Sequence, residues 1–433
     1  MRLAVVMNRS FATLFAAGAA LCIGLAAIPQ IEAADMSRGA YLAKAGDCIS
    51  CHTAGPEAAP YAGGLPIESP VGIIYSTNIT PDPVHGIGRY TLDDFTRAVR
   101  DGIAKDGRRL YPAMPYTSFT ALSDEDIRAL YDYFMHEVGP VSSAPPETRL
   151  PFPFNQRVGL FFWDLAFVEH ARFKPNEKRS AEWNRGAYLV QSLGHCGACH
   201  TPRGFAFQEK AYSEASPHYL SGAVINHWYA SNLRGDPASG LGRWREADIV
   251  EFLRVGHGGG AMAFGSMTDV VENSMQYLRD DDLKAIALYL KSLPARGEDA
   301  SYRPEGPEVA VKLAALQRGE VERPGAGLYA SFCAKCHRLT GEGKPGHTPK
   351  LAGNSLVLAD NPTSLIRLLL EGAEPPKTVA TPKPHKMPGF AAKFTDGQIA
   401  EVLSFIRSSW GNAASPVTTR QVATLRRALR KTP

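Results

Sequence analysis

The chain has 433 residues, of which 44% are hydrophobic and 21% charged, the composition of a soluble globular protein. Its formal net charge of +4 is too close to neutral to indicate a nucleic-acid partner, and none is expected. Beyond the N-terminal segment no run of about 20 apolar residues occurs, so no second membrane span is expected. The length allows two or three domains of roughly 150 residues each.

Residues 1–34 are predicted to be a secretory signal peptide that is cleaved. Arg2 and Arg9 give this segment a positive start, an apolar run follows, and Ala33 and Ala34 offer a small-residue cleavage site. Because the apolar run is long for a signal, an uncleaved membrane anchor is the alternative. Export would place the rest of the chain in an oxidising compartment, at the periplasmic face of the cytoplasmic membrane.

Three cysteine motifs divide the remaining chain. Of the seven cysteines one, Cys22, lies in the predicted signal, and the other six form three Cys-x-x-Cys pairs. A histidine follows each pair directly. The first cysteines of the pairs are 148 and 137 residues apart, which indicates three tandem units rather than one site. The motif residues are Cys48, Cys51 and His52, then Cys196, Cys199 and His200, then Cys333, Cys336 and His337.

The sequence around the motifs repeats as well. "RGAYLAKAGDCISCH" (38–52) resembles "RGAYLVQSLGHCGACH" (185–200), and "GAGLYASFCAKCH" (325–337) leads into the third motif. Each approach to the cysteines is predicted to be a short helix. Downstream, residues 75–91 match residues 229–245 at a constant offset of 154.

Each unit is predicted to end in an amphipathic helix, with apolar residues at i, i+3, i+4 and i+7. The predicted N-caps are Ser123, Asp280 and Thr395, the last in a capping box with Gln398. These patterns predict an all-α fold. The predicted organisation is a signal peptide (1–34), three domains (36–140, 184–294 and 325–412), two linkers (141–183 and 295–324) and a basic amphipathic tail (413–433).

Three chemistries compete for the Cys-x-x-Cys pairs. A zinc ribbon needs four ligands from two nearby pairs, which pairs about 140 residues apart do not offer naturally. A thioredoxin-like disulfide needs a βαβ context, whereas these units show helical stripes. Covalent c-type haem accounts for all the details: two thiols bind one porphyrin, and the adjacent histidine ligates the iron. The sequence therefore predicts three covalently bound haem c groups.

A methionine thioether is the expected sixth ligand of each iron. Met114 precedes Pro115 in the first unit, and Met387 precedes Pro388 in the third. In the second unit the offset of 154 carries Met114 to within one residue of Met267, which we therefore predict as the ligand.

The neighbouring candidates in the second unit are expected to serve other roles. Met262 and Met275 are expected to pack in the core. His257 is chemically able to ligate iron, but the repeat places no ligand at its position.

"PYAGGLPIESPVGIIYSTNITPDPVHGIG", "LYPAMPY", "GHCGACHTPRG" and "AFGSMTDVVENSMQYL" resemble the tri-haem cytochrome c subunit of bacterial membrane-bound dehydrogenases for alcohol, gluconate, sorbitol, fructose and glucose. The resemblance covers residues 36–412. It implies three tandem class I cytochrome c domains, and its "AFGSM" motif also assigns Met267 to the second haem. It further implies a catalytic partner subunit, a small third subunit, and electron delivery to ubiquinone in the cytoplasmic membrane.

The chain stops soon after the third unit, whereas the alcohol dehydrogenase branch tends to carry a longer C-terminal extension. A flavoprotein partner for a sugar or sugar acid is therefore expected rather than one holding pyrroloquinoline quinone. Substrate oxidation is expected in that partner, and no catalytic residue is assigned to this chain. The alternatives are a multihaem peroxidase, which needs an open iron, and a cytochrome subunit of a terminal oxidase.

Two further segments suggest contact surfaces. Val422, Leu425 and Leu429, beside three arginines, predict a basic amphipathic helix suited to an anionic lipid surface, although a solvated helix or partner docking is an equal alternative. An aromatic run of the first linker contains Phe161, Phe162 and Trp163, where packing between domains is expected and contact with quinone or membrane is the alternative.

Overall fold

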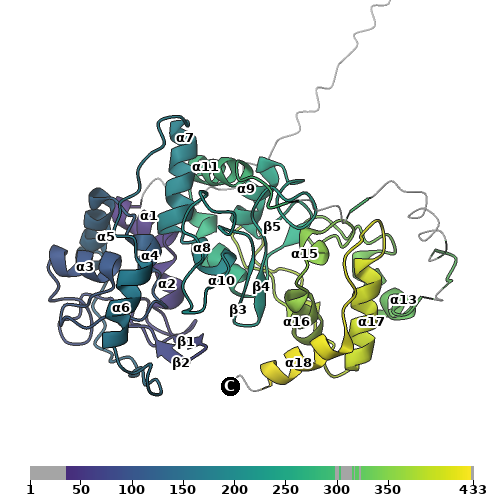
Figure 1. Cartoon of the computed structure of the whole chain (residues 1–433), viewed down its shortest axis with the longest axis horizontal. Helices are drawn as coiled ribbons and strands as arrows, with labels where there is room; N and C mark the ends of the chain where they lie inside the picture. Colours follow the sequence, from purple (N-terminus) through teal and green to yellow (C-terminus); the bar gives the residue numbers. More distant parts are fainter. Residues whose placement is uncertain (1–35, 298–301, 304–314, 316, 321–322, 431–433) are drawn as a thin grey trace, which may run out of the picture. The chain divides into compact units, whose positions relative to one another are not determined.

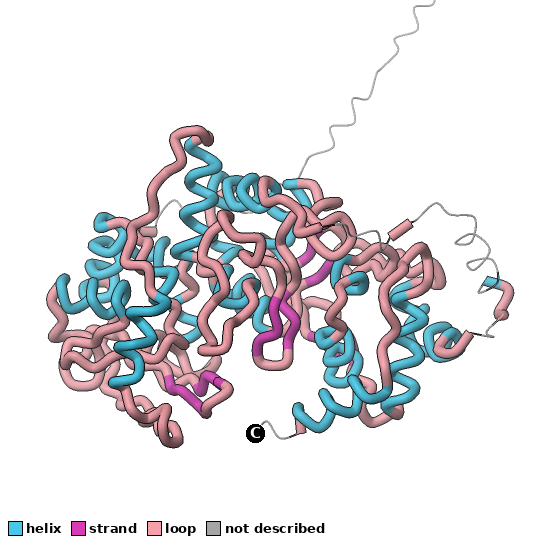
Figure 2. Tube along the Cα trace, viewed as in Figure 1, coloured by secondary structure: helices cyan, strands magenta, loops and turns pink. Residues whose placement is uncertain are grey.

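The computed structural model describes residues 36–297, 302–303, 315, 317–320 and 323–430. The predicted signal peptide and part of the predicted linker 295–324 lie outside the described residues. The described part consists mainly of helices and loops, and its strands form four short antiparallel pairs (Figures 1 and 2). The all-α prediction is confirmed. No helix in this part combines the length and apolar character needed to cross a bilayer.

Unit one runs from α1 to α5. A short helix leads into the first cysteine motif, a hairpin and two helices follow, and a longer helix ends the unit (Figure 1). The helix α6 lies in the connection to unit two. The elements are α1 (Arg38–Ala45), α2 (Cys48–Cys51), β1 (Pro66–Ser69), β2 (Gly72–Tyr75), α3 (Leu92–Asp101), α4 (Tyr116–Phe119), α5 (Asp124–His136) and α6 (Val158–Phe167).

Unit two repeats this order with a second small hairpin. The approach helix continues as a π-helical turn η1 before the cysteines, and a 3₁₀ turn η2 precedes the last helix. The elements are α7 (Ala181–Tyr188), η1 (Leu189–Leu193), α8 (Gly197–His200), β3 (Ala223–Ile225), β4 (Trp228–Ala230), α9 (Glu246–Val255), β5 (His257–Gly258), β6 (Ala261–Met262), α10 (Ser266–Asn273), η2 (Met275–Tyr277) and α11 (Asp280–Lys291).

Unit three also has an approach helix, a cysteine turn and a final helix, but its hairpin follows the middle helix, as β5 and β6 do in unit two, and one extra helix ends the unit. The elements are α13 (Ala326–Leu328), the π-helical turn η3 (Tyr329–Cys333), α14 (Ala334–His337), α15 (Ser355–Leu358), α16 (Thr363–Glu371), β7 (Gly372–Ala373), β8 (Met387–Pro388), α17 (Asp396–Arg407) and α18 (Thr419–Leu429).

A glycine lets the first and last helices of a unit cross closely. A Cβ atom on Gly39 of α1 would overlap the carbonyl oxygen of Ala129 in α5, and one on Gly186 of α7 would overlap the carbonyl of Ala285 in α11. Gly325, which caps α13 with φ of 83°, meets the carbonyl of Glu401 in α17 in the same way. The repeated "RGAYL" therefore encodes a helix crossing that only glycine permits.

Two of the three predicted N-caps are confirmed. The Ser123 side chain accepts a hydrogen bond from the backbone of residue 126, and Thr395 forms the predicted capping box with Gln398. The Asp280 prediction is wrong, because Arg279 is the N-cap of α11 and makes no side-chain cap bond. Three consecutive aspartates in the first turn of α11 instead face the positive end of the helix dipole.

Units one and two share one hydrophobic core, whereas unit three has its own. At the junction between units one and two, a tyrosine of each unit donates a hydrogen bond to an aspartate of the other unit. Asp282 of α11 accepts hydrogen bonds from Arg185 of its own unit at 2.6 and 2.8 Å and from the Tyr41 hydroxyl of unit one at 2.5 Å. Burial alone would raise the pKa of Asp282, but these donors hold that pKa below its usual range.

The reciprocal half of the junction uses the equivalent residues. Asp126 of α5 accepts hydrogen bonds from Arg38 at 2.5 and 2.9 Å and from the Tyr188 hydroxyl of unit two at 2.6 Å. Tyr41 and Tyr188 occupy the same place in the repeated "RGAYL". Units one and two therefore meet through a pseudo-two-fold junction, as the two halves of a symmetric dimer do.

We expect Tyr188→Phe and Tyr41→Phe each to lower the free energy of unfolding by about 1.5–3 kcal/mol, because each removes a hydrogen bond to a buried carboxylate. Equilibrium denaturation of the purified chain measures this. Tyr131→Phe is the matched control, because its hydroxyl donates to the neutral carbonyl of Tyr90 at 3.0 Å, and its cost should be smaller. Equal costs for all three variants would contradict a junction held by charge-assisted bonds.

The predicted tail helix packs on unit three. α18 starts with a capping box between Thr418 and Gln421 and contacts α16 and α17. Val422 and Leu425 are buried there, and Arg426 bonds Asp396 at 2.7 Å. This apolar side is therefore covered by its own unit and is not open to a lipid surface.

The expected interdomain packing of the aromatic linker is confirmed for Trp163, which contacts Tyr116 of unit one and Ala206 of unit two, and is wrong for Phe161 and Phe162. Phe161 and Phe162 are exposed on α6. Trp163 is half-buried, contacts the ring of Tyr116 and donates a hydrogen bond to the Ala206 carbonyl at 2.8 Å. Only one side of α6 is thus turned to the protein.

Candidate functional site

Each Cys-x-x-Cys-His segment folds as a single helical turn. In unit one the turn α2 carries both cysteines and His52 follows at its end, while α8 and α14 end on His200 and His337. One turn of helix places residues three apart on the same side, as attachment of two thiols to one planar ring requires. All six cysteines are free, and the second of each pair is exposed.

The three histidines share one hydrogen bond. Nδ1 of His52 contacts the Thr77 carbonyl at 2.7 Å, Nδ1 of His200 contacts the Ser231 carbonyl at 2.7 Å, and His337 contacts the carbonyl of residue 349 at 3.0 Å. A carbonyl can only accept, so Nδ1 carries the proton and Nε2 keeps its lone pair. This orients each imidazole as a metal ligand through Nε2. The Cys-x-x-Cys-His segment of each of the three units therefore fits a haem iron.

The protonation state of the three histidines also favours iron ligation. Burial lowers the pKa of all three histidines, although the backbone hydrogen bonds act in the opposite direction. A neutral imidazole is the form that binds iron.

The cysteines do not resemble redox cysteines. Burial raises the pKa of the Cys48 and Cys196 thiols to about 12 and that of Cys333 to about 11. Thiol–disulfide enzymes instead lower the pKa of their attacking cysteine. Among the described residues no three His, Cys, Asp or Glu side chains gather in one place.

The predicted methionines lie on the same cores as the cysteines. Met114 and Met267, like Cys48 and Cys196, are partly buried against the shared core of units one and two. Met387 packs with Cys333 against the core of unit three. The other two methionines of unit two lie elsewhere: Met275 is buried, as expected, whereas Met262 lines a cavity.

The backbone after the middle helix supports the same alignment of units one and two. Both helices end at a glycine with positive φ, Gly102 at 63° and Gly256 at 79°. The amide of Leu110 then bonds the Gly102 carbonyl at 2.7 Å, and the amide of Ala263 bonds the Gly256 carbonyl at 2.8 Å. Met114 lies four residues after Leu110, and Met267 lies four residues after Ala263, so the two methionines occupy equivalent places.

The structure brings the sites of units one and two together. The cysteine turn α2 packs against α10, which carries Met267, and Asn273 of α10 donates a hydrogen bond to Ser50 at 2.9 Å. The reverse contact also forms, because α4, which follows Met114 of unit one, packs against η1, which leads into the cysteines of unit two. The ring centroids of Phe119 and His195 are 5.6 Å apart there. Each cysteine segment thus meets the methionine segment of the other unit. The sequence repeat identified both segments but not this pairing.

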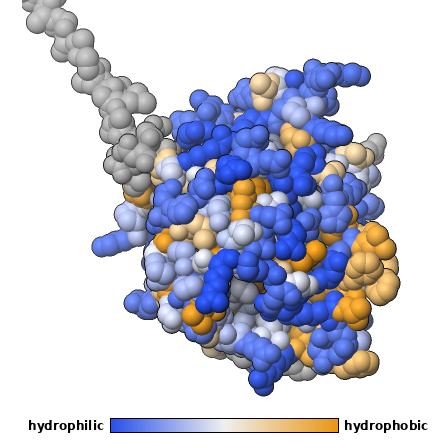
Figure 3. Space-filling model, turned by 90° about the vertical axis from the view of Figure 1, so that its left-hand side faces the viewer, coloured by the Kyte–Doolittle hydropathy of each residue, from blue (hydrophilic) through white to orange (hydrophobic). Residues whose placement is uncertain are grey.

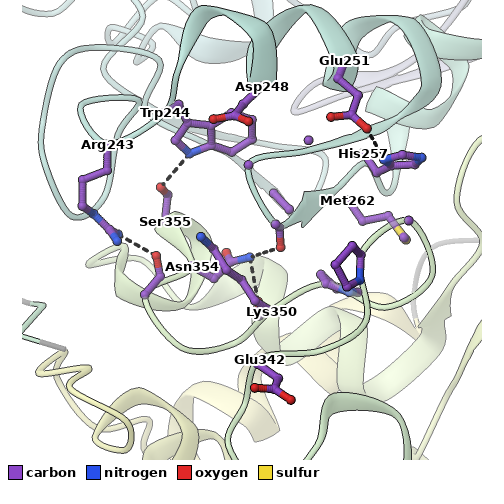
Figure 4. A pocket seen from close by; sticks show the side chains of 18 of the residues that line it. Arg243, Trp244, Asp248, Glu251, His257, Met262, Glu342, Lys350, Asn354 and Ser355 are labelled. Atoms are coloured by element: carbon purple, nitrogen blue, oxygen red, sulfur yellow. Dashed lines mark hydrogen bonds and ion pairs between the residues drawn. The ribbon is translucent and has the colours of Figure 1, made fainter. Parts of the chain in front are cut away.

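A cavity of about 430 Å³ lies between units two and three (Figure 4). Lys350 enters it from unit three, next to the residue whose carbonyl holds His337, and Met262 lines it from unit two. His257 pairs there with Glu251 at 3.3 Å, a partner that the repeat did not predict. Arg243 joins the two units by donating to the Gly353 carbonyl at 2.6 Å.

Comparison with known proteins gives the family. The chain is 47% identical to the gluconate 2-dehydrogenase cytochrome c subunit of Pantoea cypripedii over 94% of this chain and 93% of that protein. It is 48% identical to the cytochrome c subunit of the quinone alcohol dehydrogenase of Komagataeibacter europaeus, over 97% and 91%. It is 41% identical to the fructose dehydrogenase cytochrome subunit of Gluconobacter japonicus, over 90% and 82%.

Two family models also match. Residues 323–410 match "Cytochrome c", and residues 34–134 match "Cytochrome C oxidase, cbb3-type, subunit III". These ranges contain the cysteine motifs of units three and one. The chain therefore belongs to the family of cytochrome c subunits that includes those of the gluconate, quinone-linked alcohol and fructose dehydrogenases.

Proposed function

We propose that the chain is the electron-transfer subunit of a dehydrogenase complex and carries three covalently bound haem c groups, one in each unit. The observation that carries the proposal is the threefold Cys-x-x-Cys-His turn in which the histidine Nδ1 is committed to a backbone carbonyl. The relatives named above are cytochrome subunits of dehydrogenases, which supports the same role.

The thiols of each Cys-x-x-Cys pair would attach the porphyrin, and His52, His200 and His337 would ligate the three irons. Met114, Met267 and Met387 are the proposed sixth ligands, because each packs on the core that also holds the first cysteine of its unit. Haem held in this way supplies reversible one-electron transfer and leaves no open iron position. This favours electron transfer over the multihaem peroxidase alternative.

The proposed partner is a catalytic flavoprotein subunit that oxidises a sugar, sugar acid or alcohol, together with a small third subunit. The proposed acceptor is ubiquinone at the periplasmic face of the cytoplasmic membrane. Support for a quinone comes from the alcohol dehydrogenase relatives, whose names include it. The gluconate and alcohol relatives are similar to this chain to nearly the same degree, so identity alone does not favour either substrate.

Haem content tests the proposal directly. We expect acid–acetone extraction to leave the colour on the protein, and the mass of the exported chain to fit three haems. The paired variant Cys333→Ser/Cys336→Ser should lose one third of the haem absorbance, since its thiols are the attachment points of one site. A wild-type mass that fits fewer than three haems would contradict the proposal.

Electron transfer itself is tested with the co-purified complex. Substrate added to the complex should reduce all three haems, and a water-soluble ubiquinone analogue should reoxidise them. Hydrogen peroxide alone should reoxidise them far more slowly, since no iron has a free position. Rapid turnover of peroxide would instead favour the peroxidase alternative.

A further inference from the structure

The helix α6 turns an apolar face to the solvent. Val158, Phe161, Phe162 and Leu165 fall at i, i+3, i+4 and i+7 and are all exposed. This spacing normally marks the side of a helix that faces a protein core. Here it marks the outer side.

The inner side of α6 is polar. Asp164 is buried, pairs with Arg109 and accepts a hydrogen bond from the Tyr116 hydroxyl at 2.8 Å. One position before it, Trp163 donates its indole hydrogen bond to the Ala206 carbonyl. A buried carboxylate is stable only when its partners are in place, so these contacts fix the rotation of α6 and hold its apolar side outward.

The apolar face continues beyond α6. Phe152 and Phe154 precede the helix, and the ring of Phe205 from unit two lies 6.3 Å from that of Phe167. Figure 3 shows hydrophobic residues gathered at one edge of the molecule. We call the following set the α6 patch; its members are between 45% and 91% exposed: Phe152, Phe154, Val158, Phe161, Phe162, Leu165, Phe205 and Phe207. A contiguous apolar surface of this kind marks an interaction site.

The charges in the patch segments have one sign at the surface. In residues 150–168 and 203–212 the only acids are Asp164 and Glu209, and both are buried. Lys210 is exposed, and Arg157 is half-buried with its guanidinium over the ring of Tyr111. Glu169, the next residue after the first segment, is acidic and exposed, so the single sign holds within the two segments and not beyond them. An apolar face that itself carries cations is complementary to an anionic lipid surface.

We propose that the α6 patch docks the chain on an anionic lipid bilayer, with the phenylalanines and leucine at the acyl boundary and Lys210 and Arg157 at the headgroups. The inference rests on the proposed function, in which the electron acceptor is a quinone dissolved in the membrane. The tail helix α18 does not offer an equivalent surface, since its apolar side is buried in unit three.

The test is flotation of the purified, haem-loaded chain with vesicles of phosphatidylethanolamine and phosphatidylglycerol. The variant Phe162→Gln/Leu165→Gln replaces two exposed side chains and should fold normally. We expect its partition to the vesicles to fall at least tenfold, because two large apolar groups no longer enter the bilayer. Vesicles of phosphatidylcholine alone, and added salt, should weaken binding of the unmodified chain.

Val84→Gln/Val379→Gln is the matched control, because these two side chains are 69% and 47% exposed but lie in units one and three, outside the patch. It should keep vesicle binding within about twofold of the unmodified chain. Equal binding of both variants would overturn the proposal. Loss of co-purification with the catalytic subunit, with vesicle binding unchanged, would also overturn it and identify the patch as a protein interface.

A separate readout distinguishes this proposal from the proposed function. The Phe162→Gln/Leu165→Gln variant should still be reduced by substrate in the complex and reoxidised by a water-soluble quinone analogue. If its vesicle binding falls as expected while no form of the chain passes electrons to a quinone, the docking surface stands and the proposed function fails.

Discussion

Replacing Met267 with alanine is expected to remove one third of the methionine-to-iron charge-transfer absorption of the oxidised protein. The same variant should gain one carbon monoxide site in the reduced protein, since the iron loses a ligand. Its reduction potential should fall, because a thioether stabilises the reduced iron. Absorption spectra of the oxidised and carbon monoxide-treated forms measure all three sites together.

The control for this variant is Met262→Ala, which should leave both spectra unchanged. Met262 lines the cavity beside unit three, whereas Met267, like Cys196, packs against the shared core of units one and two. Met262 is a demanding control because its place in the hairpin matches that of Met387. In unit three Met387 pairs with Ala373, and in unit two Met262 pairs with His257. The hairpin register therefore aligns Met262 with the proposed ligand of unit three, whereas the repeat offset aligns Met267 with the proposed ligand of unit one. If the two variants exchanged their behaviour, Met262 would be the ligand.

Gly186→Ala is expected to destabilise units one and two by about 3 kcal/mol or more, as overpacking against a backbone atom does. The new methyl group would overlap the carbonyl oxygen of Ala285 where α7 crosses α11. In an exposed helix the same change normally stabilises by about 1 kcal/mol, so the sign itself is informative. Denaturation of the purified chain and the yield of haem-loaded protein measure the effect.

Gly139→Ala is the control for this crossing, because nothing lies within 4 Å of its added Cβ atom. Its effect on the free energy of unfolding should stay within about 0.5 kcal/mol. Gly39→Ala, the equivalent in unit one, should behave like Gly186→Ala, because it meets the Ala129 carbonyl. A stabilised Gly186→Ala variant would show that the two helices can separate without loss.

The junction between units one and two bears on electron transfer. Their cysteine and methionine segments interlock, and Tyr41 and Tyr188 tie each unit to the other's last helix. Unit three joins unit two through separate contacts, such as the hydrogen bonds of Ser364 with the backbone of Tyr229 at 2.8 and 3.0 Å. We therefore expect the first two sites to behave as a coupled pair and the third to be more independent.

The sequence by itself predicted the chemistry of the sites and determined most of the local helices. A Cys-x-x-Cys-His turn needs only five residues, so its spacing is visible without any tertiary contact. The caps at Ser123 and Thr395 were predictable for the same reason, since each bonds a backbone amide three residues away. The prediction failed at Asp280, where three successive aspartates gave no unique cap position.

Only the tertiary structure decided which way the apolar faces point. The stripe of α6 predicts a buried side, yet Arg109 and Tyr116, which hold Asp164 inward, lie 55 and 48 residues away along the chain. The stripe of α18 suggests a free lipid-binding side, yet α16 and α17 cover it. A hydrophobic period defines the residues that share a face, whereas the orientation of that face depends on distant partners that provide hydrogen bonds or apolar contacts.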